Sequence, residues 1–534
     1  MSAYSSSLPP LVRAMMRPGF FPGHRAKVEL IQTHISYVFI AGDFVYKLKK
    51  AVRFSFLDCT DAAQRHHLCD EEIRLNRRLA SDVYLACYPI YRAGDGFVLG
   101  DLLNDGANDG ADAVDHVVKM RRMPADQMLD RMLERGSVNR ATIRAIAAVI
   151  VNFFNANSTR NATRLRSAAM VWRIIIGELT ECEQPVGQTL TTEQFESIES
   201  FCRGFIASHW TMFNARARGG RVREGHGDLR CEHICIEAGK ISIFDCVEFS
   251  ERLRTTDLAS EIAFLAMDLD RLGAPALADE LIAAIVEATG DDEIPLLMPF
   301  YKCYRAIIRG VVESLRAREA EVDPRERDAA IALARNHFAL ATSYARDYAP
   351  ILVVICGLSG SGKSTIAKAM QLRFGFPIVS SDLMRKQTLS IPPDHSAADA
   401  YRSGAYALEH IDTVYAAMLE SAEQQLREGA GVILDATYQD PAHRKAAREL
   451  AQRLKLPILF IECRADDAEI RRRLVDRKKA NNPSDATVEV YAHQLKDFVA
   501  LSEIPDPQHL VVDTARPWAE IVKEMKRALE RLRR

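Results

Sequence analysis

The feature that most constrains this fold is a glycine-rich loop at residues 357–364, which reads GLSGSGKS. Its glycines allow a bend in which consecutive backbone N–H groups point inward, an arrangement that binds polyphosphates. The loop follows an apolar, β-branched run at 351–355, as expected of a buried parallel strand. It precedes a helix-forming segment, and the dipole of a helix N-terminus favours the same anion. The pattern therefore predicts a strand, a P-loop and a helix, and with them a nucleotide-binding domain.

We expect this loop to bind ATP together with Mg²⁺. The side chain of Lys363 can reach the β- and γ-phosphates, and the Ser364 hydroxyl can ligate Mg²⁺. The neighbouring residues contribute backbone N–H groups and the first turn of the helix. The predicted nucleotide-binding residues are Gly357, Leu358, Ser359, Gly360, Ser361, Gly362, Lys363, Ser364 and Thr365.

The composition is that of an ordinary globular protein. At 534 residues the chain is too long for one hydrophobic core, so about two to four domains are expected. A net charge of −2 provides no general attraction to nucleic acid or membrane. No apolar stretch approaches the ~20 residues of a membrane-spanning helix. The 11 scattered cysteines, without a secretory signal at the start, predict reduced thiols in a cytoplasmic protein.

Residues 348–534 alternate between strand and helix patterns. That alternation predicts a doubly wound parallel sheet, the α/β fold of P-loop NTPases. The expected strands are 351–356, 377–380, 431–435, 457–462 and 509–513. Asp435 ends the third of these strands, where a carboxylate can orient the magnesium shell beside Ser364. The alternative is that Asp435 is an ordinary turn residue at a strand end.

Two further groups of polar residues suggest phosphotransfer. Asp382 follows the second strand and can accept the proton of an attacking hydroxyl, while Arg385 can hold the acceptor. Arg473 and Arg477 lie one helical turn apart and can stabilise charge on the phosphates. The alternatives are that Asp382 caps a helix and that the arginines belong to a solvated helix face.

Four segments together resemble the small P-loop kinases, which include gluconate-kinase-like enzymes, polynucleotide 5′-kinases and zeta-toxin-like kinases. They read GLSGSGKST, SSDLMRK, VILDATYQDPAHR and RRRLVDRKKANNPSDAT, and the resemblance covers residues 350–534. It implies that Asp382 binds or deprotonates the acceptor hydroxyl, that Arg385 assists, and that Arg473 and Arg477 are lid arginines. Arg444 is a weaker match, as a phosphate or acceptor contact.

A second set of motifs lies in the first two thirds of the chain. Residues 225–233 read GHGDLRCEH and residues 243–249 read IFDCVEF, in a strand-rich island within a mostly helical region. Upstream lie two expected strands, 37–40 and 44–49, and a charged helix over 62–79. Over residues 30–345 this order resembles the aminoglycoside phosphotransferase-like kinases.

The resemblance implies a bilobal protein-kinase-like fold of the α+β type, with an N-lobe at 1–120 and a helical C-lobe at 121–347. It implies that Asp228 accepts the proton of the substrate hydroxyl and that Asp245 ligates Mg²⁺. A strand lysine would pair with the phosphates and a helix glutamate. Lys47 and Glu72 match best, with Lys49 and Glu71 as alternatives, and 118–122 would form the interlobe hinge.

The metal position at His233 departs from the family pattern, which has asparagine there. Mg²⁺ prefers oxygen ligands, and imidazole suits it poorly. Three interpretations remain open. The site holds one metal well, or it uses another ion, or this module transfers phosphate slowly or not at all.

The whole chain resembles bacterial fusions of an aminoglycoside phosphotransferase-like domain with a P-loop kinase domain at 348–534. We therefore expect an ATP- and Mg²⁺-dependent phosphotransferase with two modules acting on hydroxyl groups of small molecules. One alternative is a polynucleotide 5′-kinase with a groove lined by Arg385, Lys386 and Arg444, which the near-neutral charge argues against. The other is a regulatory protein whose N-terminal pseudokinase controls the P-loop domain. The sequence predicts no membrane partner and no particular oligomeric state.

Overall fold

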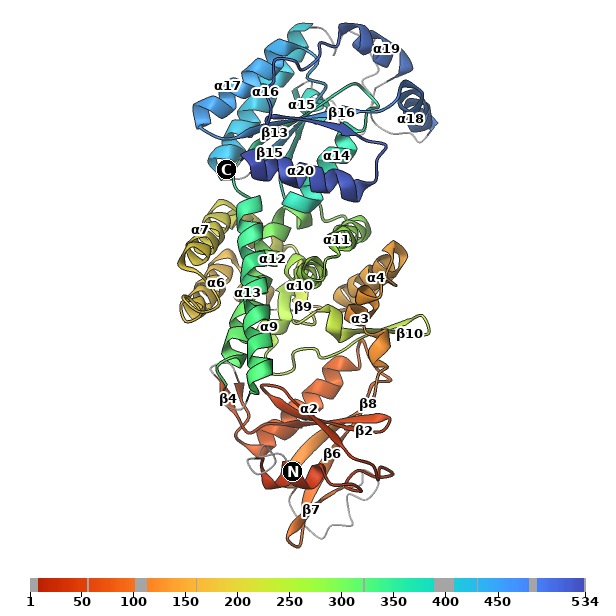
Figure 1. Cartoon of the computed structure of the whole chain (residues 1–534), viewed down its shortest axis with the longest axis vertical. Helices are drawn as coiled ribbons and strands as arrows, with labels where there is room; N and C mark the ends of the chain where they lie inside the picture. The colour runs from red at the N-terminus through yellow and green to blue at the C-terminus, as the bar shows by residue number, and fades with distance from the viewer. Residues whose placement is uncertain are drawn as a thin grey trace. The chain divides into compact units, whose positions relative to one another are not determined.

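A computed structural model describes most of the chain (Figure 1). The described residues are 8–54, 57–100, 113–159, 161–319, 322–388, 408–429, 431–479 and 487–532. They divide into two compact units. Unit 1 comprises Met1–Leu190, Trp210–Gly290 and Arg305–Phe338, and unit 2 comprises Thr191–His209, Asp291–Tyr304 and Ala339–Arg534. The predicted domain ranges stay predictions.

Unit 1 begins with a six-stranded antiparallel sheet in the order β1-β2-β3-β8-β6-β7. The expected hairpin is present, and it turns through Gly42, whose φ is 64°. On one face of the sheet, Phe39 and Tyr46 pack against Phe21 within a buried apolar cluster. The strands are β1 (Glu29–Gln32), β2 (Ser36–Ala41), β3 (Phe44–Lys49), β6 (Tyr84–Ala93), β7 (Gly96–Leu99) and β8 (Asp115–Arg121).

Helix α2 (Ala62–Asn76) packs against β6 and β8 of this sheet. Its N-terminus is capped by Asp61, whose carboxylate accepts a hydrogen bond from the backbone N–H of Gln64. Cys69 and Ile73 of the helix share a buried cluster with Tyr84 and other apolar residues of the sheet. The helix ends three residues earlier than the sequence predicted, because a turn follows Asn76.

The rest of unit 1 is mostly helical, as expected, with two short strand pairs. β10 (Ile234–Glu237) pairs with β11 (Lys240–Ile243), and β9 (Val222–Glu224) pairs with β12 (Thr255–Asp257). Residues 225–233 are a loop ending in a short 3-10 turn, so the strand-rich island is narrower than predicted. Its helices include α1 (Pro10–Met15), α3 (Leu129–Glu134), α4 (Arg140–Ala156), α5 (Ala162–Arg166), α6 (Ala168–Cys182), α8 (Trp210–Arg218), α9 (Glu251–Arg254), α10 (Leu258–Arg271) and α11 (Pro275–Thr289).

Unit 2 contains the parallel sheet that the sequence predicts, in the order β14-β15-β13-β16-β17. The fully buried strand β13 sends alternate residues to the two faces, Leu352 and Val354 to one core and Val353 and Ile355 to the other. Helices cover both faces, which confirms the doubly wound class (Figure 1). The strands are β13 (Leu352–Cys356), β14 (Ile378–Ser380), β15 (Val432–Asp435), β16 (Ile458–Arg464) and β17 (His509–Asp513).

One core of unit 2 receives α16 (Leu408–Arg427) and α17 (Pro441–Leu454), and the other receives α14 (Lys363–Phe374) and α20 (Trp518–Leu532). The remaining helices are α7 (Thr192–Ser208), α15 (Ser381–Thr388), α18 (Asp467–Lys479) and α19 (Val488–Asp497). Two long helices, α12 (Ile294–Arg316) and α13 (Pro324–Asp347), contribute residues to both units. Among the described residues, no helix combines the length and apolarity needed to cross a membrane.

Candidate active sites

The glycine-rich loop joins the end of β13 to the start of α14, as a P-loop requires. Gly357, Gly360 and Gly362 all have positive φ angles, of 131°, 82° and 96°. A Cβ atom on Gly357 would lie 2.5 Å from the backbone oxygen of Cys463, and one on Gly362 would lie 2.9 Å from the Thr514 side chain. Only glycine satisfies both the backbone geometry and the available space at these positions.

The polar side chains of the loop surround this bend. Lys363 Nζ donates a hydrogen bond to the Leu358 carbonyl at 3.0 Å, within the loop itself. Ser364 is exposed in the first turn of α14, where a hydroxyl is available to an ion. The Ser361 Oγ is buried and has no hydrogen-bond partner among the described residues. Asp435 ends β15 directly opposite Ile355 of β13. These groups fit a polyphosphate and a hard cation.

The two predicted acceptor-binding residues of unit 2 contact each other. Asp382 lies in the first turn of α15, and its carboxylate accepts a hydrogen bond from Arg385 Nη2 at 2.9 Å. The carboxylate is 54% exposed, whereas the arginine side chain is 11% exposed. Because α15 begins at Ser381, Asp382 lies within the helix rather than at its cap. Its side chain is therefore exposed beyond the carboxyl end of β14.

Arg473 is connected to the P-loop through Thr514. Its Nη1 donates to Thr514 Oγ1 at 2.9 Å, and that hydroxyl donates to the Ser361 carbonyl at 2.8 Å. Arg473 also pairs with Glu469 on its own helix at 2.7 Å. Arg477 lies on the same helix, but its side chain is outside the described part of the chain. The arginines that precede Arg473 pair with acids of α18 and are exposed, as in a solvated helix face.

Arg444 has a structural role, which corrects the sequence-based suggestion of a phosphate or acceptor contact. Its side chain is 0% exposed and pairs with Glu503 at 2.5 Å. It also donates to the carbonyls of Tyr438 and Gln439, at 2.8 and 3.0 Å. Lys386 is only 5% exposed as well. Two of the three residues expected to line a nucleic-acid groove are therefore buried.

In unit 1, Glu72 lies at the centre of a buried charged network. Its two carboxylate oxygens accept hydrogen bonds from Lys47 at 2.8 Å and from Lys49 at 2.5 Å. Lys47 also contacts Asp245 at 2.5 Å, and Lys49 pairs with Glu248. Both lysines therefore contact Glu72, but only Lys47 links it to Asp245. The alternative glutamate, Glu71, instead pairs with the adjacent Arg74.

Within this network, ion pairs favour the charged forms of Lys47 and Asp245 despite burial. Burial opposes the charge on Lys47, but Asp245 and Glu72 raise the pKa of its amine well above the ordinary value. Burial likewise opposes ionisation of Asp245, but Lys47 and His233 hold the pKa of that carboxyl far below its usual range. Glu248 differs, because burial outweighs its pairing with Lys49 and raises its pKa. The ion pairs thus give Asp245 an anionic carboxylate at any physiological pH.

The loop that carries Asp228 is held by a buried histidine. His226 Nε2 lies 2.8 Å from the Phe244 carbonyl, and its Nδ1 accepts a hydrogen bond from the Asp228 backbone N–H at 3.3 Å. These contacts require the neutral tautomer with the proton on Nε2. The backbone N–H of His226 donates to Glu261 at 2.6 Å. His226 therefore positions the loop rather than reacting itself.

The Asp228 carboxylate is engaged by Arg230 of the same loop. Arg230 Nε and Nη2 donate to its two oxygens, each at 3.0 Å. Burial disfavours the charged carboxyl, but Arg230 and His233 hold the pKa of Asp228 well below its ordinary value. His233 Nδ1 lies 2.8 Å from the Asp228 backbone carbonyl. In this conformation the predicted proton acceptor is ionised and occupied by a guanidinium.

His233 lies between Asp228, the predicted proton acceptor, and Asp245, the predicted metal ligand. Its Nε2 is 3.6 Å from the Asp245 carboxylate and 3.2 Å from Arg230 Nη2. The position therefore borders the expected metal site, where it offers a ring nitrogen. The donor set fits one Mg²⁺ ion held by Asp245, and it does not fit a second Mg²⁺ ion held by residue 233.

Sequence reasoning missed three residues that the structure places in or beside these sites: Arg230, Glu248 and Thr514. Arg230 and Glu248 are charged residues two and three positions after the predicted catalytic and metal-binding aspartates, which was an available signal. Thr514 follows the last strand and contacts Gly362 and Arg473. No local pattern indicates the contact of Thr514 with the P-loop, which joins it to Ser361, 153 positions earlier.

Comparison with known proteins identifies relatives for most of the chain. A family model described as an AAA domain matches residues 352–501. Uncharacterized proteins of Mycobacterium tuberculosis and Mycobacterium bovis are each 30% identical over 466 residues, which is 87% of this chain and 89% of theirs.

Solved structures are similar at lower identity. A gluconokinase from Sinorhizobium meliloti is 22% identical, with a TM-score of 0.25, and covers 35% of this chain and 94% of its own. A choline/ethanolamine kinase family protein from Mesorhizobium loti is 13% identical, with a TM-score of 0.37, and covers 63% of this chain and 98% of its own.

Proposed function

Because the chain belongs to one family with these mycobacterial proteins and contains a P-loop domain, we propose that it is an ATP- and Mg²⁺-dependent phosphotransferase. Its two kinase-like modules act on hydroxyl groups of small molecules. The observation that carries this proposal is the P-loop itself. Glycines that no other residue can replace bend the chain between β13 and α14, with Lys363 at the helix start. Such a loop holds a triphosphate through backbone N–H groups and one ammonium.

In unit 2, the side chains act by positioning and by charge stabilisation. Lys363 exchanges its contact with the Leu358 carbonyl for the β- and γ-phosphates. A Mg²⁺ ion held by Ser364 and Asp435 supplies charge neutralisation when it is bound. Asp382 accepts the acceptor hydroxyl's proton, and Arg385, already in contact with it, orients the acceptor.

In unit 1, Lys47 binds the nucleotide phosphates while Glu72 fixes its position. Asp245 supplies the carboxylate for Mg²⁺, and the ion pair with Lys47 keeps that carboxylate charged. Asp228 accepts the proton of the second acceptor once Arg230 has released it. The reaction in this unit therefore requires Arg230 to move or to contact the acceptor itself.

Small molecules are favoured over nucleic-acid ends as acceptors. Arg444 and Lys386 are buried, so a basic groove that includes them is not available to a phosphate backbone. The exposed Asp382 with its partner Arg385 suits a compact hydroxyl compound instead. The 11 cysteines, all of them free thiols, support a reducing cytoplasmic location.

A second candidate function is favoured by the contact between Arg230 and Asp228. A permanently paired Asp228 would make unit 1 a pseudokinase that binds ATP and regulates unit 2. A His233→Asn substitution separates the two functions, because it restores the oxygen ligand of the family pattern. If unit 1 is an enzyme, this change raises phosphotransfer, whereas a regulatory unit leaves it unchanged.

The test is a phosphorylation assay with γ-labelled ATP and a pool of small metabolites. The full-length chain is compared with Lys363→Ala, which removes the P-loop ammonium, and Asp228→Asn, which removes the carboxylate charge of unit 1. Each variant is expected to lose a different labelled product. If the wild-type chain hydrolyses ATP at the same rate with and without metabolites, and labels none of them, the proposed function is wrong.

A further inference from the structure

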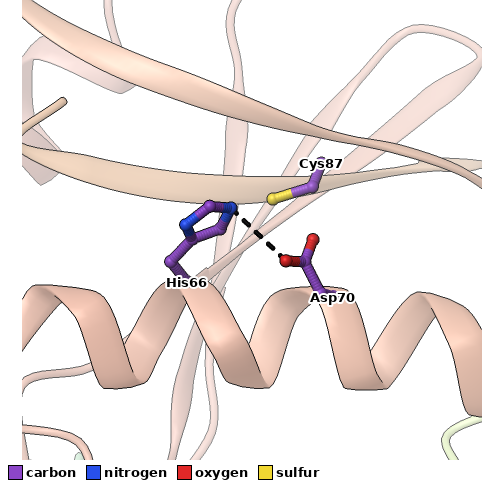
Figure 2. A group of neighbouring side chains, drawn as sticks. All are labelled: His66, Asp70 and Cys87. Atoms are coloured by element: carbon purple, nitrogen blue, oxygen red, sulfur yellow. Dashed lines mark ion pairs between the residues drawn. The ribbon is translucent and has the colours of Figure 1, made fainter.

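A group of three potential metal ligands lies on unit 1, outside the residues assigned to phosphotransfer. His66 and Asp70 project from successive turns of α2, and Cys87 projects toward them from β6 (Figure 2). One ligand atom of each residue lies within 4.8 Å of the ligand atoms of the other two. An imidazole nitrogen, a carboxylate oxygen and a sulfur therefore converge on one point.

The spacing suits a tetrahedral ion. His66 Nε2 and Asp70 Oδ2 are 3.4 Å apart. Two ligands that each lie ~2.0–2.1 Å from a tetrahedral Zn²⁺ are separated by about 3.3 Å. The imidazole and the carboxylate face each other because residues four apart lie on the same side of an α-helix.

Neighbouring residues support the orientation of these groups. His66 stacks on His116 with ring centroids 3.6 Å apart and planes at 3°, which fixes the plane of its imidazole. Cys69, which is buried on the same helix, shares an apolar cluster with Cys87. The Cys69 thiol donates a hydrogen bond to the His116 backbone carbonyl at 3.9 Å.

The three residues are accessible from solvent. The side chains of His66 and Asp70 are 46% and 58% exposed. Cys87 is partly exposed, whereas the other ten cysteines of the chain are buried. An ion can therefore enter without unfolding, and a fourth coordination position remains open to water or to a ligand.

We propose that His66, Asp70 and Cys87 bind a divalent transition-metal ion of the zinc type. Thiolate and imidazole ligands select such ions over Mg²⁺, so this site is chemically distinct from the phosphotransfer sites. The ion connects α2 to β6. Since α2 also carries Glu72, the metal restrains the helix that positions Lys47.

The first experiment measures alkylation of Cys87 by iodoacetamide in the intact chain, followed by peptide mass spectrometry. Because a metal-bound thiolate is a poor nucleophile toward the reagent, Zn²⁺ is expected to slow this reaction about tenfold or more. His66→Ala and Asp70→Asn should abolish the protection. His67→Ala, a change at an exposed histidine one position further along α2, should retain it.

The second experiment titrates the metal-free chain with Co²⁺ and records its absorption spectrum. The proposal predicts a thiolate-to-Co²⁺ charge-transfer band that is present in the wild type and in His67→Ala and absent in Cys87→Ser. It is overturned if Zn²⁺ leaves the alkylation rate of Cys87 unchanged. It is also overturned if protection persists in both ligand variants, or if the band survives in Cys87→Ser.

Discussion

Acidification is expected to loosen the loop that carries Asp228, through His226. Burial lowers the pKa of His226 from 6.5 to about 4, chiefly because the imidazole is removed from water. The neutral ring is required by its two contacts, with the Phe244 carbonyl and the Asp228 N–H. The unfolded chain gains a proton on this histidine below pH 6.5, whereas the folded chain gains it only near pH 4. Stability is therefore present above pH 6.5 and is lost progressively as the pH falls from 6.5 to 4.

The size of this loss follows from the two pKa values. At ~1.36 kcal/mol per pKa unit, the fall from 6.5 to about 4 corresponds to about 3 kcal/mol. Hydrogen exchange of a peptide covering residues 222–249 measures the opening free energy of the loop at pH 7 and pH 4. The control is His226→Gln, which keeps a donor for Phe244 but does not titrate. Between pH 7 and pH 4, the opening free energy of the wild-type loop should fall by about 3 kcal/mol more than that of the His226→Gln loop. An identical pH dependence in both chains would refute the reasoning.

Three further substitutions give separate outcomes. Gly362→Ala should weaken ATP binding strongly, because the added Cβ would lie 2.9 Å from the Thr514 side chain. Calorimetry measures the affinity. The control is Gly429→Ala, which should bind ATP normally, because φ is also positive there, at 91°, but no atom lies within 4 Å of the added Cβ. Arg444→Met should cost about 3 kcal/mol of stability in urea unfolding, because buried carbonyls lose their donor, while the folded fraction keeps its affinity for ATP. Arg230→Leu should raise the rate of phosphotransfer by unit 1, since it frees the Asp228 carboxylate. An unchanged or lower rate would instead mean that Arg230 binds the acceptor or stabilises the fold.

The fold of unit 2 could be predicted because its signals are local. The apolar run of β13 needs no distant partner to be recognised, and the five expected strands agree with the observed ones within two residues. The P-loop is likewise a contiguous segment, and its glycines are explained by the positive φ angles that they adopt. The positions of Lys47, Glu72 and Asp245 came from a resemblance in motif order, and their contacts join residues up to 198 positions apart. Their catalytic roles stay predictions.

The contacts that sequence reasoning missed depend on tertiary packing. Arg444 lies in a helix rich in charged residues, where an exposed arginine is the ordinary expectation, yet α17 presents it to Glu503 and to backbone carbonyls. The pairing of Lys49 with Glu248 is similarly non-local. Arg230 could be seen beside Asp228 in the sequence, but nothing in that spacing shows whether the guanidinium turns toward the carboxylate. The direction of a side chain in a loop is set by its tertiary surroundings rather than by its position in the sequence.

The most direct test of the account is calorimetric titration of the full-length chain with ATP and Mg²⁺. If both units bind nucleotide, the titration of the wild type should give a binding stoichiometry of about two ATP per chain. Lys363→Ala should remove the binding event of unit 2, Lys47→Ala should remove that of unit 1, and the double variant should show no heat. Absence of heat in the folded wild type, or an unchanged stoichiometry in Lys363→Ala, would contradict the account.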